Sequence, residues 1–115
     1  MPFTIPTTET KLKRKLFAYL TRNYPTAYFR KLSDRFKAGI PDVFLCHRGH
    51  AIWIELKIHP KGLTPIQDRE IEYIRAAGGN AEVLSTDGKR YWIGTTEYES
   101  LKEVVHALLK GANEL

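Results

Sequence analysis

Apolar residues recur along the chain with two different periods, and these periods predict the elements of the fold. Near the N-terminus, Leu12, Leu16 and Leu20 are spaced by about one helical turn and follow a threonine pair at positions 7–8. Threonine is a typical N-cap residue, and the Asn-Tyr-Pro sequence at 23–25 breaks the pattern. We therefore expect a first helix that ends near residue 23.

Three runs rich in aromatic and β-branched residues follow this helix. Residues 26–33 are typical of a strand, and so are residues 43–46 and 51–58. Between the last two runs, Arg48-Gly49 can form a two-residue turn, because glycine tolerates positive φ. These two strands are therefore predicted to pair as a hairpin.

A second helix is marked by its cap. Thr64 and Gln67 have the spacing of a capping box, and Pro65 stands at the first helical position. Ile66, Ile71 and Ile74 supply an apolar stripe. Gly78-Gly79 ends the pattern, so the helix is predicted between these signals.

The last third of the chain predicts two strands and a third helix. Residues 80–85 and 90–94 are typical of strands around an Asp87-Gly88 turn. Thr96 to Glu99 has the form of a second capping box. We expect it to open a final helix with an apolar face formed by Leu101, Val105 and Leu108.

The predicted order is αβββαββα, within a single α/β domain that spans residues 1–115. A helix between the third and fourth strands allows a crossover connection. We therefore expect a three-layer sandwich with a mixed central sheet, in which an antiparallel hairpin has a parallel neighbour.

The charge balance favours a polyanionic partner. Eighteen Lys and Arg against 13 Asp and Glu give a net charge of +5. The basic residues that we expect to contact nucleic acid are Lys11, Arg14, Lys15, Arg30, Lys31, Arg35 and Lys37. For the cluster in the first helix, a solvated helix face is an equally good explanation. The apolar runs are too short to span a membrane and no secretory signal is evident, so we expect a cytoplasmic protein.

The predicted hairpin brings two carboxylates together. With a turn at Arg48-Gly49, paired positions sum to 97, and Asp42 then lies opposite Glu55. Side chains alternate along a strand, so Lys57 shares the face of Glu55. Two opposed carboxylates repel each other unless a cation lies between them, and Mg²⁺ accepts such oxygens. The alternative is structural: an exposed Glu55–Lys57 ion pair and a turn residue at Asp42.

Glu9 and Gln67 are candidates for accessory roles. Glu9 shares the face of the first helix that carries Leu12 and Leu16, so it can reach the carboxylate pair directly or through water. A glutamate in the first turn also stabilises the helix dipole without any catalytic role. Gln67 is fully explained as the third residue of its capping box, although it could also reach the strand that carries Lys57.

The chain resembles the VRR-NUC domains of the PD-(D/E)XK nuclease superfamily. Four elements carry the resemblance, in order: Glu9 in the first helix, Gly39-Ile40-Pro41-Asp42, Glu55-Leu56-Lys57, and Gln67 opening a helix. The resemblance implies a restriction-endonuclease-like fold in which Asp42, Glu55 and the backbone carbonyl of Leu56 bind Mg²⁺ or Mn²⁺. It further implies that Lys57 assists catalysis and that Glu9 and Gln67 occupy accessory catalytic positions.

Compact stand-alone members of this family, often encoded by phages or bacteria, resemble Holliday junction resolvases. The resemblance therefore implies a homodimeric, metal-dependent endonuclease that cuts branched DNA, acting in the host cytoplasm if a phage encodes it. Two alternatives remain: a nucleic-acid-binding module that does not cut, and a monomeric nuclease for linear or flapped DNA. The four histidines lack the spacing of a zinc site, and we expect them at the surface or in turns.

Overall fold

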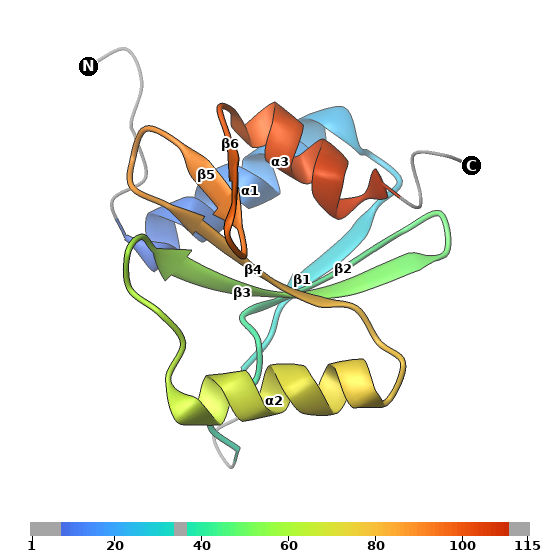
Figure 1. The fold of residues 1–115 in the computed structure, drawn as a ribbon. Coiled ribbons are helices and arrows are strands. Elements are labelled where there is room, and N and C mark those ends of the chain that lie inside the picture. Colours follow the sequence, from blue (N-terminus) through green and yellow to red (C-terminus); the bar gives the residue numbers. More distant parts are fainter. Residues whose placement is uncertain (1–7, 34–36, 111–115) are drawn as a thin grey trace.

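The computed structural model describes residues 8–33 and 37–110, which form a central sheet with helices on both faces (Figure 1). The helices are α1 (Glu9–Asn23), α2 (Pro65–Ala76) and α3 (Leu101–Leu108). The strands are β1 (Tyr28–Lys31), β2 (Val43–His47), β3 (His50–Ile58), β4 (Ala81–Thr86), β5 (Tyr91–Ile93) and β6 (Thr96–Tyr98). Helices α1 and α3 cover one face of the sheet and α2 the other, so the predicted three-layer α/β sandwich is confirmed.

The sheet is mixed, as predicted. Its strands lie in the order β1-β2-β3-β4-β5-β6, and every neighbouring pair is antiparallel except β3 and β4, which are parallel. Helix α2 makes the crossover between these two parallel strands (Figure 1). β3 is therefore a central strand, and it carries the candidate catalytic residues Glu55 and Lys57 toward its C-terminal end.

The register of the β2–β3 hairpin also follows the prediction. Val43 pairs with Ile54 and His47 pairs with His50, so paired positions sum to 97. The two turn residues, Arg48 and Gly49, have φ of 50° and 80°, which is the left-handed conformation that a tight hairpin turn needs. A turn of fixed length sets the position of every side chain further along the hairpin.

The core lies between the sheet and the pair α1 and α3. Leu12, Leu16 and Leu20 of α1 are fully buried there, as their helical spacing predicts. The apolar face of α3 is buried in the same cluster through Leu101, Val104, Val105 and Leu108. The apolar face of α3 thus packs into this domain's own core.

One prediction about the last third of the chain is wrong. Thr96 to Glu99 does not open a helix, because Thr96–Tyr98 is strand β6, which pairs with β5. Gly94, with φ of 58°, begins the tight turn between these strands. Helix α3 begins at Leu101, and Ser100 is its N-cap, accepting a hydrogen bond from the Glu103 backbone N–H at 3.2 Å. The observed order is therefore αβββαβββα.

The histidines depart from the prediction at one position. His47 is only 8% exposed, and its ring lies edge-on to Tyr24 with 5.3 Å between centroids. Burial lowers the pKa of His47, and the charge of Arg48 adds to this effect. No helix in the described ranges is both long and apolar enough to cross a membrane.

Candidate active site

The candidate site lies where β2 begins and β3 approaches its end. Asp42 directly precedes β2, and its backbone carbonyl accepts a hydrogen bond from the Leu32 N–H at 2.8 Å, which continues the pairing with β1. The Asp42 side chain points toward β3, where its Oδ2 accepts a hydrogen bond from the Leu56 backbone N–H at 2.8 Å. Asp42 is thus fixed by one neighbouring strand through its backbone and by the other through its carboxylate.

Glu55 is a buried acid in the middle of the sheet. It is only 2% exposed, and its Oε1 atom has no hydrogen-bond partner among the described residues. A buried carboxylate oxygen without a donor is costly, so such an atom indicates a missing partner. The side chain therefore has an unfilled coordination or hydrogen-bonding position.

The electrostatics of Glu55 show which groups lie around it. Burial is the main cause that raises the pKa of Glu55 to about 8, and a hydrogen bond with Asp42 and the charge of Asp42 raise it as well. The charge of Lys57 opposes this rise, and the charge of Glu9 adds to it. Three other candidate residues predicted from the sequence, Asp42, Lys57 and Glu9, are therefore close enough to influence Glu55.

Lys57 follows Glu55 on the same face of β3 and is 3% exposed. Lys57 lies close enough to Glu55 for its charge to oppose the rise in the pKa of that acid. The strand places the two side chains next to each other without a turn or loop, so their relative position is rigid. A group that binds the pair therefore meets an acid and a cation together.

Glu9 reaches the site from the start of α1. It lines a small cavity of about 150 Å³ together with Thr10, Lys13, Lys31, Asp42 and Leu56. Lys31, at the end of β1, was predicted from the sequence to contact nucleic acid, and it lies at this cavity. Lys13 belongs to the same basic cluster of the first helix as Lys11, Arg14 and Lys15. It stands one helical turn after Glu9, and that spacing was the signal for it.

The other predicted residues that the structure describes are not part of the lining of this cavity. Gln67 is in the capping box: its Oε1 accepts from the Thr64 N–H at 3.0 Å, and its own N–H donates to Thr64 Oγ1 at 3.2 Å. Lys37 forms an ion pair with Glu70 at 3.7 Å. Arg30 lies over the ring of Tyr28, 4.4 Å from its centroid. Lys11 and Arg14 are exposed on α1, Lys15 is partly exposed, and Arg35 lies outside the described residues.

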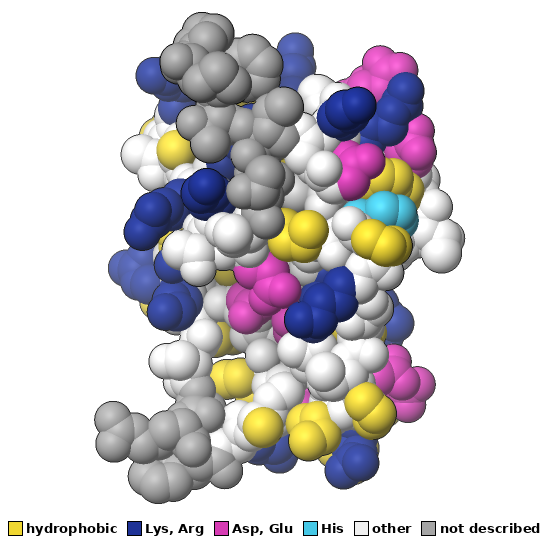
Figure 2. Space-filling view, turned by 90° about the vertical axis from the view of Figure 1, so that its left-hand side faces the viewer, with side chains coloured by type: hydrophobic (Ala, Val, Ile, Leu, Met, Phe, Trp, Pro, Cys, Tyr) yellow, Lys and Arg dark blue, Asp and Glu magenta, His cyan; other side chains and the backbone are white. Residues whose placement is uncertain are grey.

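The side of the molecule seen in Figure 2 has a mixed surface. Acidic side chains gather near its centre, and Lys and Arg side chains gather along one side of them (Figure 2).

Across residues 8–33 and 37–110, no three His, Cys, Asp or Glu side chains are grouped closely enough to hold a metal ion by themselves. A metal at this site would therefore depend on two carboxylates, backbone oxygen, water and substrate. Mg²⁺ commonly binds proteins in this way.

Comparison with solved structures gives three informative neighbours. A structure described as a VRR-NUC domain is 25% identical, with a TM-score of 0.58 over 70% of this chain and 85% of its own. A second, described as a VRR-NUC domain protein, is 20% identical, with a TM-score of 0.63 over 90% of this chain and 88% of its own. The third is Hjc of Archaeoglobus fulgidus, a Holliday junction resolvase from an archaeal hyperthermophile. It is 15% identical, with a TM-score of 0.54 over 79% of this chain and 88% of its own. No family model and no curated protein sequence matches the chain.

Proposed function

Because the chain has the VRR-NUC fold of the PD-(D/E)XK nucleases, we propose that it is a metal-dependent endonuclease that hydrolyses phosphodiester bonds in DNA. The observation that carries this proposal is the buried Asp42–Glu55 pair with Lys57 beside it. The net charge of +5 supports a polyanionic substrate.

The residues fit a divalent cation. Among the described residues Glu55 Oε1 is buried without a hydrogen-bond partner, and burial raises the pKa of Glu55 although the charge of Lys57 opposes the rise. In this proposal Asp42, Glu55 and the Leu56 backbone carbonyl hold Mg²⁺ or Mn²⁺, and Glu9 contributes through water. The bound metal would supply Lewis-acid stabilisation of the phosphoryl oxygens and lower the pKa of a bound water.

The protein's own groups have separate roles in the hydrolysis. Asp42 is held by the Leu56 N–H, so its carboxylate is oriented before any ligand binds. Lys57 places its ammonium beside Glu55, where it offsets the negative charge that develops on the phosphoryl group. Water adds to phosphorus, the P–O bond to the leaving oxygen breaks, and that oxygen gains a proton.

Branched DNA and a homodimer are the finer parts of the proposal. The described function of the Hjc neighbour supports a four-way junction as substrate. Two copies related by a two-fold axis would place two such sites on one junction, which suits paired cuts. Gln67 is proposed as an accessory residue because it occupies the corresponding position of the family pattern.

The test compares cleavage of a four-way junction and a linear duplex, with Mg²⁺ and with chelator, by the wild-type chain and two variants. Asp42→Asn and Glu55→Gln keep the shape of each side chain, and we expect each to lower cleavage at least about 100-fold, as loss of an electrostatic catalytic group does. Glu72→Gln, on an exposed position of α2, is the matched control and should cut normally. Cutting that persists in both site variants, or without any divalent metal, would rule out the proposal.

A further inference from the structure

Two aromatic rings are stacked face to face at the surface beside the candidate active site. The rings of His59 and Trp92 are 3.9 Å apart between centroids and inclined by only 6°. His59 is exposed and Trp92 is partly buried, so the stack begins on the sheet and ends at solvent. Parallel planes at this spacing are also the geometry in which a nucleobase lies on an aromatic side chain.

The strand registers place this stack next to Lys57. Lys57 pairs with Ser85 across β3 and β4, and Ser85 pairs with Trp92 across β4 and β5. Directly paired residues share a face of the sheet, so Lys57, Ser85 and Trp92 form a row. His59 directly follows β3, two residues after Lys57, and its backbone N–H donates to the Thr86 carbonyl at 2.8 Å, which fixes its backbone beside the end of β4.

The distances along this row suit a nucleic-acid strand. Neighbouring strands lie about 4.8 Å apart, so the backbone of Trp92 is roughly 10 Å from that of Lys57. Stacked nucleotides advance by about 3.4 Å each. A base on the His59–Trp92 stack would therefore lie roughly three stacked nucleotides from a phosphate at Lys57.

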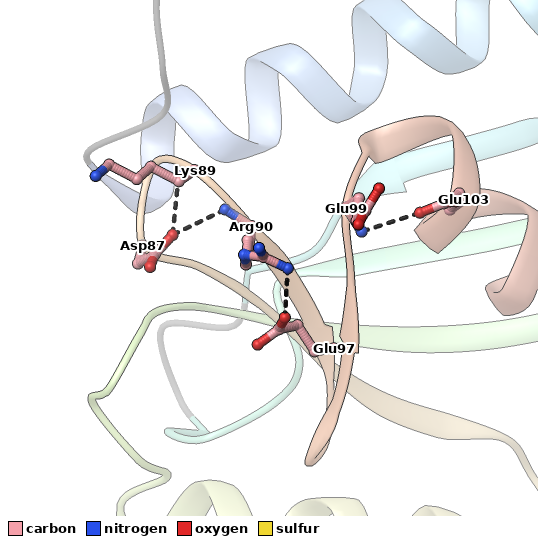
Figure 3. A network of polar contacts seen from close by, with 6 residues as sticks. All are labelled: Asp87, Lys89, Arg90, Glu97, Glu99 and Glu103. Carbon is pink, nitrogen blue, oxygen red and sulfur yellow. Dashed lines mark hydrogen bonds and ion pairs between the residues drawn. The ribbon is translucent and has the colours of Figure 1, made fainter.

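The loop between β4 and β5 borders the stack with a fixed backbone and a cation. Asp87 Oδ1 accepts hydrogen bonds from the backbone N–H groups of Lys89 and Arg90, at 2.8 and 2.9 Å (Figure 3). These bonds are the main cause that lowers the pKa of Asp87, and the charge of His59 contributes, which indicates that the loop lies close to the ring. Arg90 is paired with Glu97 at 2.6 Å, whereas Lys89 is exposed on the same loop.

We propose that His59 and Trp92 form a stacking platform for an unpaired base of the DNA strand that enters the active site, with Lys89 beside the adjoining phosphate. This inference rests on the proposed nuclease function and adds a preference for DNA that is unpaired near the cut. Aromatic stacking does not select a base, so the platform would read strand separation rather than sequence.

The chain offers a direct spectroscopic test, because Trp53 and Trp92 are its two tryptophans. Trp53 packs against Phe44, with 5.1 Å between ring centroids, and stands two residues before Glu55 on β3. A chain carrying Trp53→Phe therefore reports on Trp92 alone, and Asp42→Asn in the same chain prevents cleavage during the titration. The probes are a fully paired duplex and a duplex of equal length with a short unpaired end.

We expect the duplex with the unpaired end to quench Trp92 emission and the paired duplex to leave it nearly unchanged. His59→Ala should weaken binding of the unpaired-end duplex roughly tenfold, the usual size of one base–aromatic stack, and leave binding of the paired duplex unchanged. Tyr73→Ala is the matched control, since Tyr73 is 59% exposed on α2 away from this row. It should alter neither affinity.

Two results separate failure of this inference from failure of the proposed function. If both duplexes bind, Trp92 emission stays constant and His59→Ala binds like its parent, the platform is overturned. The nuclease proposal then stands on the cleavage test with wild-type Asp42. A wild-type chain that neither cuts nor binds DNA would overturn both.

Discussion

The carboxylate of Asp42 accepts a hydrogen bond from the backbone N–H of Leu56, with 2.8 Å between Oδ2 and the nitrogen. Leu56 stands between Glu55 and Lys57 on β3, so this bond ties the acid before β2 to the strand segment that carries the other two site residues. The bond holds the Asp42 carboxylate beside Glu55, whose pKa is raised in part by its hydrogen bond with Asp42 and by the charge of Asp42. We therefore expect the bond to contribute to stability as well as to the site.

Replacing Asp42 should separate this structural role from the electrostatic one. Asp42→Asn keeps an oxygen acceptor for the Leu56 N–H, whereas Asp42→Ala leaves that N–H unpaired at a residue that is 1% exposed. An unpaired buried donor costs about 1–3 kcal/mol. The free energy of unfolding of the alanine variant, measured by urea titration, should therefore be lower than that of the asparagine variant by that amount. Both changes remove the same charge, so their difference isolates the hydrogen bond. Equal free energies of unfolding would show that the bond contributes nothing.

The raised pKa of Glu55 predicts how stability depends on pH without metal. The unfolded chain loses this proton near pH 4.5, and the folded chain loses it near pH 8. Between these values the folded state holds a proton that the unfolded state has released. Raising the pH across this interval therefore lowers the free energy of unfolding, and the loss levels off above pH 8. Thermal melting at several pH values in chelator measures the slope.

Two comparisons test the assignment of this slope to Glu55. Glu55→Gln cannot titrate, so its melting temperature should fall less than that of the wild type between pH 4.5 and 8. Added Mg²⁺ should stabilise the wild type more at pH 8 than at pH 5, because the metal competes with the proton for the carboxylate. A wild type and a glutamine variant with parallel pH profiles would contradict the assignment.

Local signals in the sequence were enough to predict the site hairpin. A two-residue turn at Arg48-Gly49 leaves one register in which the apolar face of β3 is buried, and that register holds in the structure. The cap of α2 was predicted for the same reason, because Thr64, Pro65 and Gln67 act within one helical turn. Features that depend on neighbours in sequence were therefore accessible from the sequence.

The features that local patterns did not predict depend on strand pairing. Thr96 with Glu99, and Ser100 with Glu103, both have the spacing of a capping box. Residues 96–98 pair with β5, and strand residues cannot also form the first turn of a helix. The N-cap of α3 is therefore Ser100 and not Thr96. The His59–Trp92 stack depends on the parallel register of β3 and β4, which no local pattern specifies.

Gln67 offers a way to separate its observed capping role from its proposed accessory role. Gln67→Ala loses the side-chain bond to the Thr64 N–H and should destabilise the chain by about 1 kcal/mol. Gln67→Glu keeps a capping box, since glutamate is the other residue common at this position, and should retain stability. We expect cleavage to fall in both variants. Full cleavage by the glutamate variant would limit Gln67 to its structural role.

Lys31 lies at the cavity that Glu9 and Asp42 also line, and it should contribute to DNA affinity through charge alone. Each lysine that neutralises a phosphate releases counterions, which adds about 0.9 to the slope of log affinity against log salt concentration. Lys31→Ala should therefore weaken binding of junction and linear DNA alike and reduce this slope by about one. Fluorescence anisotropy at several salt concentrations measures it, with Asp42→Asn in the background to prevent cleavage. Lys102→Ala, an exposed lysine on α3, removes the same formal charge away from the cavity. If both lysine variants reduce the slope equally, the effect comes from net charge and Lys31 does not contact a phosphate.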